Sequence, residues 1–427
     1  MKIINWQETD VILRRQILSR DISNNKEDVA SSVANIITRV RAEGDAALLY
    51  YTEIYDSVKL NSMRVSCKSS QTEIKDAIDK AYKRIKQFHE LQTPSNVEYN
   101  KDGVKAWKSW LPIDNVGLYI PGGTAPLIST LLMLAIPAKL AGCQNIVCVT
   151  PPNSEGGIDP AILYAAELCG IQYVYSIGGA QAIAALAYGT ETVPKVDKVF
   201  GPGNKYVTEA KIQVSRDPLG AALDMPAGPS EVLVIAGETA NPQLVASDLL
   251  AQAEHDKDAV AICITTNTQL AEKINIAITD QLQSLKRKDI LNKSLKHAYI
   301  IIAKDLNEAF EISNAYAPEH LILNIEDAQN YIKFVRNAGS VFLGQWSAEA
   351  LGDYASGPNH VLPTYGYARN YSGLGVESFM KAITFQEISE EGLLGLAKTV
   401  EALADFEGLY AHKMSVSTRR LLLERKS

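Results

Sequence analysis

From Val116 onward, short apolar runs alternate with longer helical patterns, and this alternation constrains the fold more than any other feature of the chain. The first apolar runs lie at 117–120, 145–149, 173–177, 198–200 and 232–235. Such runs, separated by helices, are typical of parallel strands joined by crossover helices. The sequence therefore predicts an α/β fold built on a parallel sheet.

A second series of apolar runs follows the first, again with helical patterns between the runs. Strands are expected at 260–265, 299–303, 320–324 and 340–343, and helices at 268–284, 305–315 and 326–337. A chain of 427 residues is also longer than a single core usually supports. We therefore expect two α/β layers, one after the other.

The two ends of the chain have a different pattern. The first hundred residues contain amphipathic helical segments such as 28–44 and 72–91, with few strand signals. After Gly375 the pattern is again helical, with Ser389 as a plausible N-cap before an acidic first turn. We expect a helical addition at the start and a small module at the end.

Charge and hydropathy exclude several classes of partner. The formal net charge of −7 and the lack of a basic face argue against nucleic acid. The most apolar stretch, 127–138, is too short to cross a bilayer, and the N-terminus lacks the apolar core of a signal peptide. The five cysteines show no C-x-x-C spacing, as expected of free thiols in a reducing compartment. We expect a cytoplasmic protein with no nucleic-acid or membrane partner.

Three glycine-bearing turns, at 121–123, 178–181 and 201–204, lie where a strand leads into a helix. Glycine lets a ligand approach the backbone there, and a helix start offers free amide donors to a phosphate. A tight turn without a ligand explains each of them singly. None has the G-x-G-x-x-G pattern, so the turns alone do not indicate a dinucleotide.

Two short segments carry side chains suited to a metal ion or to proton transfer. His255 follows Gln252 by three residues, a spacing that on a helix puts both on one face, where they can hold one ion or simply bond to each other. Glu319 and His320 are adjacent groups that can both move protons. On a regular strand they would face opposite ways, so a shared site requires irregular backbone after Pro318. A surface glutamate beside a core histidine is the alternative.

Further polar residues are ambiguous from their spacing alone. Asp353 lies in a turn-like run, where aspartate often makes only local hydrogen bonds. Glu407 and His412 are five residues apart, and on one continuous helix they would point in different directions. Both can reach one ligand only if a new helix starts between them.

Taken together, these segments resemble the histidinol dehydrogenase family, from about Trp110 to the C-terminus. The motifs that carry the resemblance are GLYIPGG at 117–123, GGAQAIA at 178–184, GPGN at 201–204, DMPAGPSE at 224–231, QAEH at 252–255, PEH at 318–320 and GDYAS at 352–356. The resemblance implies NAD-dependent oxidation of L-histidinol to L-histidine through the aldehyde, the last step of histidine biosynthesis. It also implies a bound zinc ion and the use of two NAD molecules.

The resemblance assigns roles to individual residues. It implies that zinc is held by Gln252, His255, Asp353 and His412, a set of nitrogen and oxygen donors that suits this metal or another divalent first-row ion. His320 is implied as the base that takes the hydroxyl proton, and Glu319 as the group that activates water. Ser230, Glu407, His320 and the four metal ligands are implied substrate contacts, and His360 is expected in the pocket wall. For NAD, the implied contacts are Tyr119, Gln181 and Asn204.

The resemblance also implies two incomplete Rossmann-like, parallel-sheet domains with helical N-terminal and C-terminal additions. We expect an N-terminal arm at 1–25, a first α/β domain at 26–118 and 230–374, an NAD-side α/β domain at 119–229, and a C-terminal dimerisation module at 375–427. The family is a homodimer whose C-terminal module crosses to the neighbour, so Glu407 and His412 would complete the partner's site.

Three other interpretations remain open from the residues themselves. Zinc beside glutamate and histidine also suits a metal-dependent hydrolase, which needs no nicotinamide. A metal-binding scaffold without catalysis is a second alternative. An aldehyde dehydrogenase with a cysteine nucleophile is a weaker third, because no cysteine lies in a glycine-bearing turn or beside a base.

Overall fold

The computed structural model describes residues 1–20, 26–68, 70–122, 126–226 and 228–425. Its chain divides into two compact units. The first comprises Met1–Gln92 and Ile113–Phe379, and the second comprises Thr93–Pro112 and Met380–Ser427. Both predicted α/β layers belong to the first unit.

The first sheet of this unit has six parallel strands in the order β1-β12-β11-β10-β13-β14. The strands are β1 (Lys2–Asn5), β12 (Tyr299–Ile302), β11 (Val260–Thr265), β10 (Glu231–Ala236), β13 (His320–Asn324) and β14 (Ser340–Leu343). Every residue of β10 is buried, as expected for a central strand covered on both faces. The ranges predicted for β11, β13 and β14 are confirmed.

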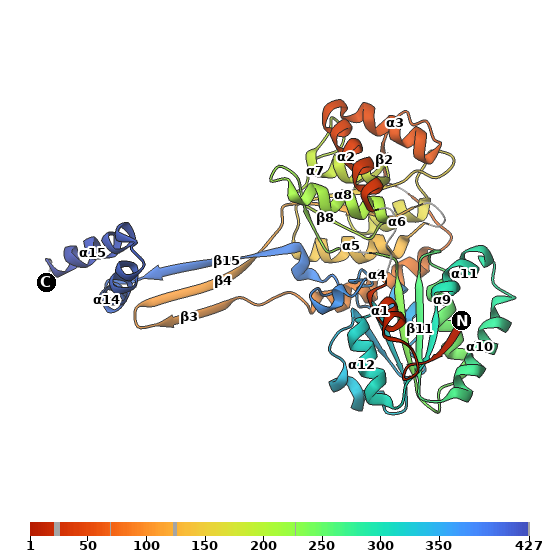
Figure 1. Cartoon of the computed structure of the whole chain (residues 1–427). Helices are drawn as coiled ribbons and strands as arrows, with labels where there is room; N and C mark the ends of the chain where they lie inside the picture. The colour runs from red at the N-terminus through yellow and green to blue at the C-terminus, as the bar shows by residue number, and fades with distance from the viewer. Residues whose placement is uncertain (21–25, 69, 123–125, 227, 426–427) are drawn as a thin grey trace. The chain divides into compact units, whose positions relative to one another are not determined.

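Helices cover both faces of the first sheet (Figure 1). On one face, Val232 and Val234 pack with α9 (Pro242–Ala253) and α10 (Thr268–Leu282). On the other, Leu233 and Ile235 pack with α1 and α12. This is the two-residue alternation of a strand, with both faces apolar. The remaining helices are α1 (Val11–Ser19), α11 (Lys288–Ser294), η1 (Leu295–His297) and α12 (Leu306–Tyr316). Where a helix was predicted at 326–337, the structure has the 3₁₀ helix η2 (Ala328–Phe334).

The second sheet has the order β2-β7-β6-β5-β8-β9, and all its pairs are parallel except β2 with β7. Its strands are β2 (Arg64–Ser66), β7 (Tyr173–Ser176), β6 (Asn145–Thr150), β5 (Asn115–Tyr119), β8 (Lys198–Phe200) and β9 (Ala222–Leu223). Its helices are α2 (Lys26–Glu43), α3 (Asp45–Asp56), α4 (Lys75–Glu90), α5 (Ile128–Ala141), α6 (Pro160–Leu168), α7 (Gly179–Tyr188) and α8 (Lys205–Arg216). Two parallel-sheet layers of α/β type are therefore confirmed.

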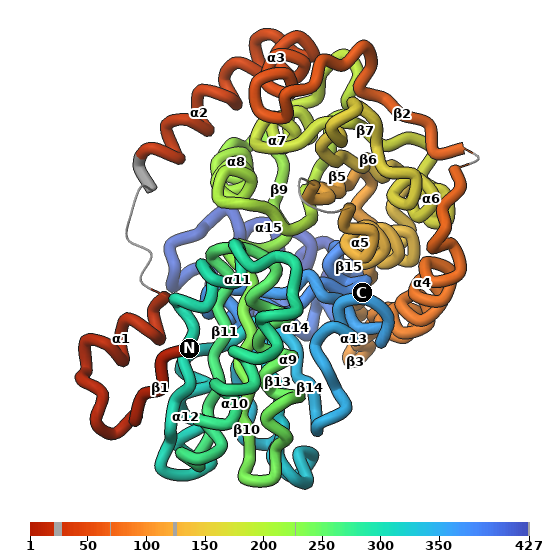
Figure 2. Tube along the Cα trace, turned by 90° about the vertical axis from the view of Figure 1, so that its right-hand side faces the viewer, coloured from red at the N-terminus to blue at the C-terminus, as the bar shows by residue number. Residues whose placement is uncertain are grey.

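The packing of the N-terminal segment differs from the expected grouping of 26–118 with 230–374. Helices α2 and α3 lie beside α7 and α8 in Figure 2, and their apolar residues share one core with the second sheet. Strands β2 and β5 also belong to that sheet, where β2 pairs with β7 and β5 pairs with β6. The apolar stripe of α2 predicts a buried helix, but it carries no information on which of two sheets the helix covers.

The second unit contains strands that the sequence analysis did not predict. An antiparallel sheet has the order β15-β4-β3, with β3 (Val97–Lys101), β4 (Val104–Pro112) and β15 (Met380–Ile388). Residues Asp102 and Gly103, both at positive φ, form the hairpin turn between β3 and β4. Strands β3 and β15 are largely exposed, and polar or charged residues interrupt all three strands, so they lack the apolar runs by which the other strands were predicted.

Two helices, α14 (Glu390–Phe406) and α15 (Tyr410–Glu424), pack together at the end of this ribbon. The predicted N-cap is confirmed, because the Ser389 hydroxyl accepts a hydrogen bond from the Gly392 N–H at 3.1 Å. The short elements before the ribbon are α13 (Glu349–Tyr354), η3 (Tyr367–Arg369) and η4 (Val376–Phe379). Within the described residues, no helix is both long and apolar enough to span a membrane.

Truncating the central strand should destabilise the first sheet. Leu233 has no exposed surface, so we expect Leu233→Ala to lower the free energy of unfolding by about 2–5 kcal/mol through lost burial and a residual cavity. Ile276→Ala on α10, where the side chain is 61% exposed, serves as control and should change it by less than about 0.5 kcal/mol. Urea unfolding followed by circular dichroism measures both. Equal effects of the two substitutions would contradict the assigned core.

Candidate active site

The residues expected to transfer protons lie where two neighbouring strands of the first sheet begin. Glu231 opens β10 and His320 opens β13, and Val232 is in register with His320. Parallel α/β sheets more often hold ligands at the carboxyl ends of their strands. Here the amino ends carry the site, together with the turn that follows α9.

The backbone before His320 is irregular, as a shared site for Glu319 and His320 requires. Ala317 ends α12 in the left-handed region, with φ of 54°, and Pro318 follows it. Both side chains are buried, and His320 Nδ1 lies 3.6 Å from Glu319 Oε2. The left-handed residue followed by proline therefore turns two sequence neighbours toward one site.

The backbone of Glu231 contacts both of these residues. The Glu231 N–H donates to Glu319 Oε2 at 2.7 Å, and the Glu231 carbonyl oxygen lies 3.2 Å from His320 Nδ1. Because a carbonyl can only accept, His320 carries its proton on Nδ1, and Nε2 is left free as an acceptor. His320 Nε2 lies 3.7 Å from Asp353 Oδ1.

Burial sets the protonation of this pair. It lowers the pKa of His320 to about 4, although the Asp353 carboxylate opposes the shift. It also raises the pKa of Glu319 well above its ordinary value, and the charges of Glu231 and Asp353 add to the rise. The imidazole is therefore neutral near pH 7 and can accept a proton.

Three side chains beside His320 have ligand atoms close enough to share one metal ion. They are His255, Glu349 and Asp353, whose candidate ligand atoms all lie within 4.8 Å of one another. Asp353 and Glu349 are four residues apart on the short helix α13, which puts both carboxylates on one face. His255 Nε2 lies 3.8 Å from Asp353 Oδ2.

Glu349 was not among the residues chosen from the sequence. Its carboxyl group is buried, Oε1 lies 3.6 Å from His320 Nδ1, and Oε2 has no hydrogen-bond partner. Burial raises its pKa well above the ordinary value, and the charges of Asp353 and Glu319 act in the same direction. The four-residue spacing of two acidic residues in an otherwise apolar segment could have indicated it.

Gln252 and His255 do not share a helix face as their spacing suggested, because α9 ends at Ala253. Gln252 lies in the last turn of α9, and His255 lies in the turn that follows, where its N–H donates to the Gln252 carbonyl at 3.2 Å. The Gln252 side chain is fully buried, and neither amide atom has a partner. Buried amides without partners are rare. This set of oxygen and nitrogen donors fits a divalent cation.

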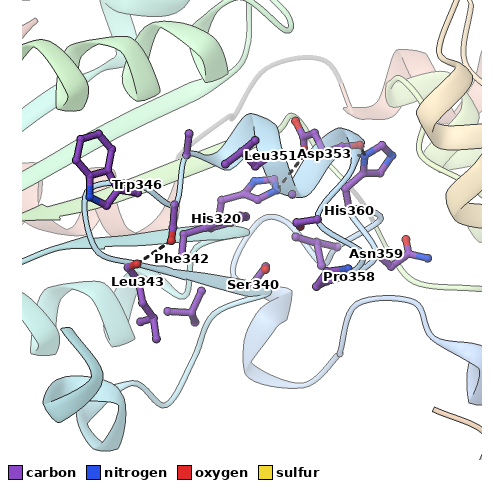
Figure 3. A pocket seen from close by; sticks show the side chains of 16 residues that line it. His320, Ser340, Phe342, Leu343, Trp346, Leu351, Asp353, Pro358, Asn359 and His360 are labelled. Atoms are coloured by element: carbon purple, nitrogen blue, oxygen red, sulfur yellow. Dashed lines mark hydrogen bonds and ion pairs between the residues drawn. The ribbon is translucent and has the colours of Figure 1, made fainter. Parts of the chain in front are cut away.

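A cavity of about 350 Å³ opens beside His320 and Asp353 (Figure 3). Its wall includes Phe342, Trp346 and His360, and the His360 Nδ1 lies 2.8 Å from the Asp353 carbonyl oxygen. His360 therefore lies in the pocket wall, as expected. The volume is at the small end of the range for metabolite pockets.

The other expected substrate contacts lie in different parts of the chain. Ser230 directly precedes Glu231, and its carbonyl oxygen accepts the Val260 N–H at 3.0 Å. Glu407 caps the end of α14, and His412 lies in α15, so a new helix does start between them. Both belong to the second unit, and both are exposed.

The three residues expected to contact NAD lie at carboxyl ends of strands in the second sheet. Tyr119 ends β5, and its hydroxyl accepts the Gly179 N–H at 3.2 Å. Gln181 lies in the first turn of α7, buried, with Oε1 unpartnered. Asn204 caps α8 and accepts from the Tyr206 and Val207 N–H groups. Residues 123–125 of the first glycine-bearing turn lie outside the described residues.

The unpartnered amide of Gln252 suggests a stability test on metal-free protein. We expect Gln252→Leu to leave the thermal midpoint unchanged or to raise it, because two buried polar atoms without partners are removed. Zinc at 100 times its dissociation constant should stabilise the wild type by about 2.7 kcal/mol and the variant far less.

Gln213→Leu is the matched control for this test. The Gln213 amide donates to the Ala30 carbonyl oxygen at 2.8 Å and to Glu209 Oε1 at 2.9 Å. Its replacement should destabilise the metal-free protein by about 0.5–1.5 kcal/mol and leave the zinc effect intact. A large loss of metal-free stability in Gln252→Leu, or an unchanged zinc effect, would contradict a ligand role.

Known proteins resemble this chain over nearly its whole length. A sequence model of the family described as histidinol dehydrogenase matches residues 19–420. Proteins named histidinol dehydrogenase from Vibrio parahaemolyticus and Vibrio cholerae are 49% and 50% identical to it, with 98% of each chain covered. The crystal structure of histidinol dehydrogenase from Elizabethkingia anophelis matches with a TM-score of 0.94 at 45% identity, over 99% of both chains. The resemblance noted in the motifs is therefore confirmed, and the chain belongs to the histidinol dehydrogenase family.

Proposed function

We propose that this chain oxidises L-histidinol to L-histidine through the aldehyde, with NAD as the hydride acceptor in both steps, as the last step of histidine biosynthesis. The observation that carries the proposal is the buried, neutral imidazole of His320 beside the Glu319 carboxyl group, at a cavity edged by metal-binding side chains. Membership of the family supports the same reaction.

In the first step, His320 acts as the base. Its Nδ1–H is held by the Glu231 carbonyl, so Nε2 accepts the proton of the substrate hydroxyl. NAD, when bound, would take the hydride from the same carbon, which leaves the aldehyde. The low pKa of the buried imidazole keeps it in the basic form at neutral pH.

In the second step, Glu319 acts on water. A desolvated carboxylate with a raised pKa is a stronger proton acceptor than an exposed one, so Glu319 can take a proton as water attacks the aldehyde carbonyl. The proton that His320 received in the first step passes to the carbonyl oxygen, which gives the aldehyde hydrate and leaves His320 neutral again. From the resulting hydrate, His320 again accepts a hydroxyl proton while the second hydride leaves. The product is the carboxylate of histidine.

Gln252, His255, Asp353 and His412 would hold zinc, which when bound supplies positive charge that anchors the imidazole and amine of the substrate. The unpartnered Gln252 amide and the short separation of His255 from Asp353 support this set. Glu349 belongs to the same group of donors and is a further candidate ligand. Ser230 and Glu407 complete the proposed substrate contacts.

Tyr119, Gln181 and Asn204 are the residues we propose to contact NAD. Their shared position in the second sheet supports this assignment. Each lies at or just after the end of a strand, in a glycine-bearing turn or in the helix that follows the turn. Gln181 has a buried oxygen still to be satisfied. The Asn204 Oδ1 already caps α8, so its Nδ2 is the atom it can offer.

A cysteine-dependent aldehyde dehydrogenase does not fit this chain. All five cysteines are buried and free. Burial raises the pKa of each thiol, to about 12 for Cys67, so none offers a thiolate at neutral pH. Free thiols also support the proposed cytoplasmic location.

A steady-state assay with histidinol and NAD tests the reaction. We expect two NAD molecules reduced per histidinol, loss of activity with chelator and recovery with zinc. His320→Ala should lower kcat by about 10²–10⁴-fold, the usual cost of losing a general base. A hydrolase would reduce no NAD, and full activity of His320→Ala would exclude the assigned base.

We also propose a homodimer in which the helices α14 and α15 complete the partner's site. Several apolar side chains of these helices are exposed in their own unit, including Phe406 at 94%, Tyr410 at 66% and Met414 at 66%. Exposed apolar groups in this number mark an interaction surface. Glu407 and His412 lie on the same segment.

Mixed dimers test the crossing. His412→Ala and His320→Ala subunits, each inactive alone, should recover about a quarter of the wild-type activity after random pairing, because half of the dimers are mixed and each has one intact site of two. If each site uses only residues of its own subunit, mixing restores nothing. Size-exclusion chromatography checks that subunits have exchanged.

A further inference from the structure

An ion pair with almost no solvent exposure lies directly behind the catalytic pair. Arg20, at the end of α1, donates from Nε to Glu231 Oε1 and from Nη2 to Glu231 Oε2, the latter at 2.7 Å. The exposed fractions of the two side chains are 4% and 1%. Two parallel donors on one carboxylate fix its orientation as well as its charge.

Stability alone does not account for burying this ion pair. Removing two charges from water is costly, and a buried ion pair often adds nothing over apolar side chains of the same volume. The carboxylate is also held by the Tyr365 N–H, which donates to Glu231 Oε1 at 3.3 Å. We therefore ask which neighbouring groups the ion pair holds in position.

Arg20 is connected to the catalytic pair by two routes. Through the carboxylate it holds residue Glu231, whose N–H binds Glu319 and whose carbonyl binds His320. Its Nη2 also donates to the Ala317 carbonyl oxygen at 3.4 Å, in the turn that leads to Glu319. The guanidinium lies 3.6 Å from the centre of the Tyr316 ring, at the end of α12.

We propose that Arg20 and Glu231 are positioning residues for the dehydrogenase reaction, an inference that rests on the proposed function of Glu319 and His320. The Arg20 fork fixes the position of Glu231. The backbone N–H of Glu231 in turn holds the Glu319 carboxyl group, and its backbone carbonyl keeps the proton of His320 on Nδ1. Nε2 then faces the substrate hydroxyl with its lone pair. A segment near the N-terminus thus controls the geometry of a site more than 200 residues further along the chain.

Arg20→Lys in the full-length, zinc-loaded enzyme is the main test. Lysine keeps the positive charge but cannot form the fork, so the protein should fold while the backbone of Glu231 loses its fixed orientation. We expect kcat to fall roughly 10²-fold, the scale of a small misplacement of reacting groups, with KM for histidinol unchanged. The double variant Arg20→Met/Glu231→Gln, which removes both charges together, should show the same loss.

Two comparisons separate positioning from general damage. Arg14→Met, on the same helix, removes a guanidinium that lies 5.2 Å from the Trp6 ring and should leave kcat unchanged. In a His320→Ala background, Arg20→Lys should cause little further loss, because residues that act as one unit are not additive. Wild-type kcat in folded Arg20→Lys, a loss only in KM, or an equal loss in the His320→Ala background would overturn the inference.

Nitrogen NMR of labelled histidine side chains gives a readout that needs no turnover. The His320 signal is identified by its absence from His320→Ala, and we expect protonated Nδ1 in the wild type and a mixture of tautomers in Arg20→Lys. An unchanged His320 signal in Arg20→Lys would contradict the positioning role even if histidinol proved not to be the substrate. Failure of the wild type to oxidise histidinol would instead count against the proposed function alone.

Discussion

The pairing of β10 with β13 is the constraint on which the site depends. Because Val232 is in register with His320, the residue before each of them, Glu231 and Glu319, is also brought to the same edge. The backbone N–H and carbonyl of Glu231 then bind a carboxyl oxygen of Glu319 and an imidazole nitrogen of His320. A shift of register by one residue would turn these side chains to opposite faces, so the chemistry is tied to the strand ladder itself.

The candidate site residues lie at opposite strand ends in the two sheets. In the first sheet, the amino ends of β10 and β13 and the turn after α9 carry the groups proposed for proton transfer and metal binding. In the second, the carboxyl ends of β5, β7 and β8 carry the glycine-bearing turns, which is the usual arrangement for a nucleotide. The proposed NAD contacts thus lie at the usual edge of a parallel sheet, and the proposed proton-transfer and metal-binding residues lie at the opposite one.

Local patterns predicted the buried strands well, because an apolar run such as 260–265 reports a covered position directly. Local patterns missed elements that are exposed and features that depend on residues far away in the sequence. Strands β3 and β15 are exposed, and the end of α9 at Ala253 depends on the turn that follows it. Glu349 could have been found from its spacing to Asp353. No local feature distinguishes Arg20, whose partner lies 211 residues away.

The ribbon of β4 and β15 fixes the distance between its base and the helices α14 and α15. Each strand has nine residues, which at the usual rise spans roughly 30 Å, and the Gly103 carbonyl at its tip accepts the Ser389 N–H at 2.9 Å, just before α14. A slip of the ladder by two residues would keep every side chain on its own face yet carry the helical tip about 7 Å along the ribbon. The length of this ribbon therefore sets how far His412 lies from the ribbon's base, so insertions in the ribbon would matter more than substitutions on its surface.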